Sequence, residues 1–307
     1  MENKPWRSRS DVSGEAASSR RNVMDTWNHI YANFDPVAFS IFGLKVHWYG
    51  MMYVLALLFA LFVAKWLVKK DNIDLKGAVL DDFFIWVEVG VILGARLGYI
   101  LFYDPNTWEY LTHPWNIFNP FVNGEFVGIR GMSYHGALMG FMLGAYLYAR
   151  KVGVDFWFLM DRVGIAVPIG YFFGRVGNFL NQELVGRETT LTDTPWGIYV
   201  DGVLRHPSQL YEAFLEGILI FVVLYMVRKK MTFTGAIALT YGAMYGLGRF
   251  IAEFWRAPDV QIGYVFGTDW LTQGQVMSLS MAILAVFWLF TLYLLDKKNI
   301  TYFSCSK

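Results

Sequence analysis

The chain of 307 residues is 55% hydrophobic and 17% charged, whereas ordinary soluble domains carry about 25% charged residues. This composition indicates an integral membrane protein, and its aromatic content of 18% fits the belts that flank a bilayer. The formal net charge of +1 gives no reason to expect a nucleic-acid partner. The single cysteine, Cys305, excludes an intrachain disulfide, and the scattered histidines lack metal-ligand spacing, so we expect neither a metal nor a cofactor.

The N-terminal region, residues 1–33, is polar and is predicted to be a flexible tail. No apolar core follows within signal-peptide distance, so we expect no cleavable signal. Phe34-Asp35-Pro36 then breaks the chain. The following residues, 37–46, are interpreted as a short extended or interfacial piece.

Seven apolar segments each come near the length of about 20 residues that a helix needs to cross a bilayer. They cover approximately residues 48–68, 83–103, 131–149, 163–180, 210–227, 235–254 and 276–295. Residues 181–209 are polar and rich in threonine, and we interpret them as a small external cap. The predicted fold is an all-α polytopic membrane protein with a seven-span domain over residues 34–296 and a cytoplasmic tail over 297–307.

Basic residues favour one set of loops and helix ends, which the positive-inside rule places in the cytoplasm. The N-terminus is then outside and the C-terminus inside. The arginines of the N-terminal tail run against this bias, but they lie upstream of the window of about 15–20 residues in which the rule applies. The cytoplasmic set is Lys65, Lys69, Lys70, Lys76, Arg150, Lys151, Arg162, Arg228, Lys229, Lys230, Lys297, Lys298 and Lys307.

Glycines recur four residues apart in several spans, which lets helix backbones approach closely in lipid. We therefore predict tight helix packing at these positions. No internal repeat is visible, which gives an inverted-repeat transporter little support. The glycine sets are Gly94/Gly98, Gly136/Gly140/Gly144, Gly170/Gly174 and Gly242/Gly246.

The stretch 174–186, Gly-Arg-Val-Gly-Asn-Phe-Leu-Asn-Gln-Glu-Leu-Val-Gly, puts polar groups at the end of an apolar span. Such groups are costly in a membrane and persist where a cavity or a polar ligand compensates them. On a helix, Arg175, Asn178 and Gln182 share one face. A fixed cation beside an amide suits an anion such as a lipid phosphate.

A second polar stripe contains Tyr245, Arg249, Glu253 and Arg256, which share one helical face. One interpretation is an internal Arg249–Glu253 ion pair that staples helices. The other is a phosphate clamp shared with Arg175. Both stay open from spacing alone.

Three further sites stand out, and the first two carry two interpretations each. His135, near the outer end of the third span, is either a structural residue or a general base, since imidazole titrates near neutrality. Arg96 is either a buried paired charge or part of a lipid site. The run from Arg205 to Glu212 is interpreted as a loop that caps the fifth span, with Pro207 suited to a helix start.

These observations describe a seven-span protein with an arginine-rich cavity that opens outward. The arrangement suits an enzyme acting on an anionic phospholipid and equally suits a transporter or channel for an anionic solute. A non-catalytic lipid-binding scaffold is a third reading.

Several motifs resemble the bacterial prolipoprotein diacylglyceryl transferase family. The resemblance runs in order from about residue 34 to residue 295, and its strongest part is the stretch 174–186. The other matching segments are His47–Gly50, Gly94–Tyr99, Ser133–Gly136, Arg205–Glu212 and Arg249–Asp259.

The resemblance implies a reaction in the bacterial inner membrane. The diacylglyceryl group of phosphatidylglycerol would move to the lipobox cysteine of a prolipoprotein signal peptide, giving a thioether and glycerol-1-phosphate. The substrate then supplies the nucleophile, and arginines stabilise the phosphate leaving group. On this reading Arg175 and Arg249 hold the phosphate, and His135 assists deprotonation of the thiol. The predicted lipid-binding set is completed by Tyr49, Arg96, Asn178, Glu183, Tyr245, Glu253 and Arg256.

Overall fold

The computed structural model describes residues 23–41, 44–105, 107–122, 125–126, 128, 131–258 and 263–298. Most of the predicted N-terminal tail, the end of the C-terminal tail with Cys305, and the motif residue Asp259 lie outside the described residues.

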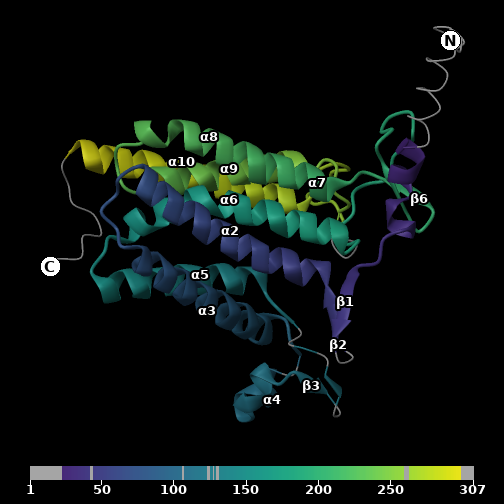
Figure 1. Ribbon diagram of the computed structural model, residues 1–307, viewed down its shortest axis with the longest axis horizontal. Coiled ribbons are helices and arrows are strands. Elements are labelled where there is room, and N and C mark those ends of the chain that lie inside the picture. Colours follow the sequence, from purple (N-terminus) through teal and green to yellow (C-terminus); the bar gives the residue numbers. More distant parts are fainter. Residues whose placement is uncertain are drawn as a thin grey trace, which may run out of the picture. The chain divides into compact units, whose positions relative to one another are not determined.

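Long helices occupy the seven predicted spans of the described chain (Figure 1). Five of these helical segments are long and apolar enough to cross a membrane, among the residues described, and the segments outside that set are α5 and α9. The segments are α2 (Trp48–Lys70), α3 (Gly77–Phe102), α5 (Tyr134–Val152), α6 (Phe156–Leu180), the run α7–η3–α8 (Ser208–Glu212, Ala213–Leu219, Ile220–Val227) with η4 (Arg228–Lys230), α9 (Ala236–Ala252) and α10 (Gln273–Lys297).

Two helices begin earlier than predicted: α3 begins at Gly77 rather than near residue 83, and α6 also departs from its predicted bounds. The fourth span was expected near residue 163, but α6 begins at Phe156, because Asp155 Oδ1 accepts a hydrogen bond from Phe158 N at 2.7 Å and caps the helix. The fifth span is not uniformly α-helical: residues Ala213–Leu219 form a π-helical turn. Such turns are rare and are frequent at functional sites.

The prediction of an all-α fold was incomplete, because three two-stranded antiparallel hairpins accompany the helices. Strands β1 (Val37–Ile41) and β2 (Leu44–His47) confirm the extended piece predicted just before the first span. Strands β3 (Phe121–Val122) and β4 (Glu125–Phe126) lie between α3 and α5 in the chain. In the predicted cap, β5 (Ile198–Val200) and β6 (Val203–Arg205) are joined by Asp201-Gly202, whose positive φ angles of 50° and 80° fit a tight hairpin turn.

The chain divides into two compact units, and each is described by itself. The first contains the chain up to Phe59, Val167–Met226 and Thr240–Phe287. The second contains Ala60–Ala166, Val227–Leu239 and the chain from Trp288.

In the second unit, α3 and α5 pack along a stripe of glycines. A Cβ atom on Gly94 would collide with the carbonyl oxygen of Gly136, and one on Gly140 would collide with that of Gly90. One on Gly98 would lie 2.7 Å from Gly136 Cα. The order of these contacts makes the two helices antiparallel, and the predicted close packing is confirmed for this pair. Helix α5 is bounded as its sequence suggests: Ser133 Oγ accepts from Gly136 N at 3.2 Å, and Gly153 ends it with φ 67°.

The connection between α3 and α5 contains α4 (Thr107–Thr112) and η2 (Pro114–Phe118), again within the second unit. Arg96 anchors it. The side chain is only 5% exposed, its Nε donates to Ile117 O, and its Nη1 donates to Gly131 O at 3.3 Å. Its guanidinium also lies 5.2 Å from the ring of Tyr110.

In the first unit, the chain before residue 34 packs against the cap. Trp27 Nε1 donates to Trp196 O at 2.8 Å, and the buried Asn28 donates to Pro195 O at 2.9 Å. Tyr31 packs in a core cluster with Phe179 and Ile198. The last part of the predicted tail is therefore an ordered piece of the fold.

Helices α9 and α10 also approach closely in the first unit. A Cβ on Gly246 would lie 2.6 Å from Ser278 O, so the glycine pair predicted on α9 packs as expected at this position. By contrast, a Cβ on Gly174 would meet nothing within 4 Å in the described chain, and the packing role predicted for that glycine was wrong.

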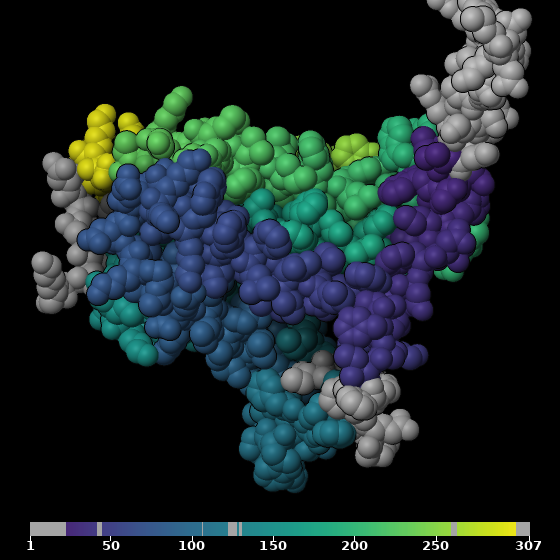
Figure 2. Space-filling model, in the orientation of Figure 1, coloured from purple at the N-terminus to yellow at the C-terminus, as the bar shows by residue number. Residues whose placement is uncertain are grey.

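Figure 2 shows side chains of α2 at the molecular surface, where Val54, Leu58 and Phe62 are more than half exposed, as expected for a lipid-facing helix.

Candidate active site

Three arginines of the first unit converge on one buried carboxylate, that of Glu212. Arg175 Nε lies 2.9 Å from Glu212 Oε2, Arg249 Nη1 lies 2.8 Å from the same oxygen, and Arg256 Nη1 lies 4.0 Å from Oε1. Glu212 has no exposed surface. The arginines come from α6, from α9 and from the chain just after α9, so the cluster joins segments far apart in the sequence.

The cluster keeps unused hydrogen-bonding capacity. Arg249 Nη1 forms an ion pair with Glu212 Oε2 at 2.8 Å, but this buried atom makes no contact of hydrogen-bond geometry within the described chain, and neither does the buried Glu212 Oε1. A buried donor without a partner is costly. An anionic ligand with several acceptor oxygens would satisfy it, which is the chemistry expected of a phosphate site.

Arg175 is oriented by a chain of hydrogen bonds along α6. Its Nε donates to Tyr171 Oη at 2.8 Å, and its Nη1 donates to Asn178 Oδ1 at 3.1 Å. Asn178 Nδ2 in turn donates to Glu183 Oε1 at 2.7 Å. The helical spacing that predicted Arg175 and Asn178 on one face is thus confirmed. Tyr49 lies beside them, since a Cβ on Gly177 would be 3.3 Å from its ring.

Gln182 does not share this face, contrary to the prediction. Helix α6 ends at Leu180, and Gln182 has φ 58°, with its N–H donating to Phe179 O and the N–H of Glu183 donating to Asn178 O. This pattern is a Schellman cap, which reverses the chain. Gln182 Nε2 consequently donates to Phe34 O at 2.8 Å and ties the N-terminal segment down, while Glu183 is directed back to Asn178.

The polar stripe predicted on α9 is also found in the structure, and Glu253 at its end contacts both Arg249 and the start of α10. Arg249 Nη2 lies 2.9 Å from Glu253 Oε2, and Glu253 Oε1 accepts from Thr272 Oγ1 at 3.1 Å. Thr272 caps α10 reciprocally with Gln275, as in a capping box. The predicted ion pair of Arg249 with Glu253 is therefore confirmed, and Arg249 contacts Glu212 at the same time, whereas the phosphate clamp stays a prediction. Tyr245 lies beside Tyr171, with ring centroids 5.4 Å apart.

Sequence reasoning missed Glu212 and its neighbour Glu216. Both are fully buried, and neither oxygen of Glu216 has a hydrogen-bond partner among the residues described. A Cβ on Gly248 would lie 3.2 Å from Glu216 Cγ, which places this carboxyl against α9 next to Arg249. The signal was present, because two acids within an apolar span require buried partners of opposite charge.

The segment before Glu212 supports the site rather than capping its own helix. Among the residues described, no side chain forms a capping hydrogen bond with α7. Instead Gln209 Nε2 donates to Glu183 O at 2.6 Å, and Ser208 Oγ donates to Leu184 O at 3.2 Å. His206 Nδ1 lies 3.2 Å from Tyr211 Oη, and burial lowers the pKa of this imidazole below its usual value.

At Gly186, the last residue of the stretch 174–186, glycine is required for a steric reason. A Cβ there would lie 2.5 Å from His206 O and 2.6 Å from Trp255 O, so only glycine fits between these two backbone segments. The next residue, Arg187, donates from Nε to Arg256 O at 2.9 Å and from Nη2 to Glu253 O at 3.3 Å. It fixes the chain that carries Glu253 and Arg256.

The remaining predicted residues, His135 and Arg96, belong to the second unit. His135 is the second residue of α5, is exposed, and makes no hydrogen bond among the described residues, and its ring lies 5.7 Å from the ring of Tyr134. The structure therefore gives it no evident structural task. Arg96 is buried against backbone carbonyls, which favours the structural interpretation. No group of three or more metal-ligating side chains is found in the part of the chain that the structure describes.

Comparison with known proteins agrees with the resemblance. A family model for prolipoprotein diacylglyceryl transferase matches residues 36–291. The chain is 65% identical over 257 residues to the phosphatidylglycerol–prolipoprotein diacylglyceryl transferase of Wolinella succinogenes, covering 84% of this chain and 93% of that protein. The proteins of the same name from Campylobacter jejuni and Aliarcobacter butzleri are 59% and 55% identical, each over 86% of this chain and 95% of the relative.

A match over this length and at this identity carries a clear conclusion: the chain belongs to the prolipoprotein diacylglyceryl transferase family.

Proposed function

We propose that this chain transfers the diacylglyceryl group of phosphatidylglycerol to the lipobox cysteine thiol of a prolipoprotein, the first step of lipoprotein maturation. The carbon–oxygen bond between the diacylglyceryl group and the phosphate breaks, and a carbon–sulfur bond forms. Glycerol-1-phosphate leaves with the bonding electron pair, and the thiol proton passes to a base. The observation that carries the proposal is the buried arginine cluster on Glu212, in a chain of this family.

Arg175 and Arg249 are the proposed phosphate ligands. As the phosphodiester leaves it becomes a monoester and gains negative charge, and fixed cations in a site of low dielectric stabilise that charge. Arg249 Nη1 lies 2.8 Å from Glu212 Oε2, but it makes no contact of hydrogen-bond geometry within the described chain. Arg175 is held by Tyr171 and Asn178, which limits its motion during the reaction.

Tyr49, Asn178 and Glu183 are proposed to position the head group. Asn178 and Glu183 are joined by a hydrogen bond of 2.7 Å, and Gln209 fixes the backbone of Glu183. The rest of the predicted set, Tyr245, Glu253 and Arg256, orients Arg249 or contributes to a second lipid site. Their support is the direct contact of Arg249 with Glu253.

His135 is the proposed thiol base. A free cysteine thiol has a pKa of about 8.5, so deprotonation near neutral pH benefits from a base. His135 has an exposed side chain and is engaged by no hydrogen bond in the described chain. Both properties are compatible with contact to an incoming peptide.

We further propose seven spans in the bacterial inner membrane, with the N-terminus outside and the C-terminus in the cytoplasm. Helix α5 runs antiparallel to α3 along the glycine stripe, and α9 packs along α10, so two apolar spans accompany the two less apolar helices. On this arrangement residues 34–296 are the catalytic domain, 181–209 an external cap and 297–307 a cytoplasmic tail. Single-cysteine labelling of intact cells tests the orientation: a cysteine at Asp201 should react, and one at Asn72 should not.

The direct test is to incubate purified protein with phosphatidylglycerol and a synthetic lipobox peptide and to analyse the peptide by mass spectrometry. We expect a gain of one diacylglyceryl group that is absent when the peptide cysteine is serine. An unmodified peptide, with folded protein that binds lipid, would contradict the proposal and favour the scaffold. Movement of an unchanged anionic solute across sealed vesicles would favour the transporter.

A further inference from the structure

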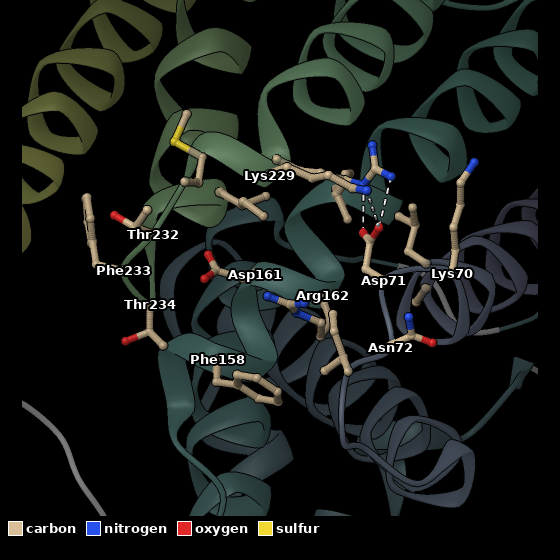
Figure 3. A pocket seen from close by; sticks show the side chains of 17 residues that line it. Lys70, Asp71, Asn72, Phe158, Asp161, Arg162, Lys229, Thr232, Phe233 and Thr234 are labelled. Atoms are coloured by element: carbon tan, nitrogen blue, oxygen red, sulfur yellow. Dashed lines mark hydrogen bonds and ion pairs between the residues drawn. The ribbon is translucent and has the colours of Figure 1, made fainter.

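A cavity of about 630 Å³ lies within the second unit, and none of its lining residues belongs to the arginine cluster on Glu212. It is formed by the end of α2, the first turns of α6, and the chain from η4 to the start of α9 (Figure 3). Its volume lies in the range of about 300–1,000 Å³ that is usual for small-ligand sites.

The lining is rich in cations. Four basic side chains face two acidic ones, a surplus of two positive charges if all are ionised: Lys70, Arg162, Arg228 and Lys229 against Asp71 and Asp161. Neutral hydrogen-bonding groups in the lining come from Asn72, Thr232 and Thr234.

Both acidic groups are already engaged. Asp71 accepts from Arg228 Nε at 2.7 Å and from Arg228 Nη2 at 3.0 Å, and the bonds from Arg228 lower the pKa of this carboxyl. Asp161 accepts from Gly235 N at 2.8 Å and from Ala238 N at 2.9 Å, where it caps the first turn of α9. Neither carboxylate forms a close ion pair with Arg162 among the described residues, although both attract its charge from a longer distance.

Arg162 is a basic residue of the lining whose hydrogen-bonding capacity is not used within the described chain. It forms no ion pair or hydrogen bond within the described chain, and its Nε is buried without a partner. Its guanidinium stacks 4.9 Å from the ring of Phe158, which holds the planar group at the cavity (Figure 3). The positive-inside rule accounts for basic loops, but it does not account for a guanidinium with a buried, unsatisfied donor.

We infer that this cavity binds a phosphate-bearing anion, with Arg162 as its main ligand and Lys229 and Lys70 as supporting charges. A phosphate offers several acceptor oxygens to the fork of donors on an arginine, and its charge offsets the surplus of the lining. The phosphate belongs either to an anionic lipid head group or to a soluble phosphate ester. In the orientation proposed above, the site opens on the cytoplasmic side and is separate from the reaction.

Hydrogen–deuterium exchange of the full-length protein locates the binding without depending on transfer activity. The protein is placed in nanodiscs of zwitterionic lipid, with inorganic phosphate added in one arm and phosphatidylglycerol included in the other. We expect slower exchange in the peptides covering residues 71–76 and 228–235. Protection by the lipid alone identifies a head-group site, and protection by both probes shows that the phosphate is sufficient. No protection by either probe would overturn the inference.

Arg162→Gln should raise the ligand concentration that gives half-maximal protection roughly 10- to 100-fold, as expected for the loss of a charged hydrogen-bond donor. Lys151→Gln is the matched control, because it removes one exposed charge of α5 that does not line the cavity, and it should leave binding unchanged. Lys229→Gln, at a side chain that is 73% exposed, should fold normally and weaken binding several-fold. Equal protection in wild type, Arg162→Gln and Lys229→Gln would refute the site.

Discussion

Glu212→Gln should destabilise the protein far more than the loss of an ordinary ion pair. The substitution keeps the size of the side chain but removes the charge that Arg175 and Arg249 contact at 2.9 and 2.8 Å. Because Glu212 is fully buried, water cannot take its place around the arginines. Removing one partner of a buried pair costs about 3–5 kcal/mol, since it leaves an uncompensated charge.

The expected shift in melting temperature follows from the length of the chain. Unfolding entropy of about 2.1 cal/mol/K per residue gives roughly 0.64 kcal/mol/K for 307 residues. A loss of about 3–5 kcal/mol then lowers Tm by about 5–8 °C. Transfer activity should fall about 100-fold as well, because the two arginines lose the group that fixes their positions.

Glu188→Gln is the matched control in the same unit. Glu188 pairs with Arg205 at 3.1 Å, but its side chain is 69% exposed. Exposed pairs contribute about 0.2–1 kcal/mol, so Tm should fall by no more than about 1.5 °C. Both variants are measured by thermal unfolding in the same detergent, and their transfer rates are measured with the lipobox peptide. Equal Tm shifts for the two variants would show that Glu212 does not hold the cluster together.

Four further predictions concern other contacts. Arg175→Lys keeps the charge near Glu212 but loses the hydrogen bond to Asn178, so the initial transfer rate should fall about 100-fold; a normal rate would remove Arg175 from the phosphate site. His135→Gln should lower the transfer rate about 100-fold near neutral pH with little change in Tm, and retention of most activity would return His135 to a structural role. Gly140→Ala should lower stability by about 1–3 kcal/mol, because its Cβ would collide with Gly90 O, whereas Gly174→Ala should be neutral or stabilising by up to about 1 kcal/mol in the same unfolding assay. Because the folded pKa of His206 is depressed, the unfolded chain binds more protons below about pH 6.5, so Tm should fall as the pH drops through that value, and His206→Gln should show a weaker slope.

The helices and their glycine contacts could be predicted because they depend on local pattern. Apolar runs of about 20 residues place the spans, and helical spacing puts Arg175 beside Asn178. Gly94 and Gly140 pack as their four-residue repeats suggest. Gly174 shows the limit of this reasoning, because the same repeat occurs where a Cβ would meet no atom of the described chain within 4 Å.

The missed features depend on contacts between distant segments or on unusual backbone. Glu212 is central because α6 and α9 both bring an arginine to it, which no spacing within one helix reveals. Gln182 does not lie on the predicted face, because the helix ends in a cap whose left-handed residue is Gln182 itself rather than a glycine. Arg162 was counted among the cytoplasmic charges, and only the structure shows that its Nε is buried without a hydrogen-bond partner in the described chain.

The contacts of Glu212 have a consequence for the choice of lipid. The carboxylate of Glu212 already contacts the arginines, so the site contains an internal anion that a ligand has to displace, as in ion exchange. If Arg175 and Arg249 hold the lipid phosphate, as we propose, an incoming phosphodiester must compete with Glu212 for the same donors. The cation of a zwitterionic head group then weakens the attraction of that lipid to the arginines. A lipid with a net negative charge exchanges more favourably. Preference for an anionic lipid can then arise from competition with an internal carboxylate rather than from a pocket shaped to one head group.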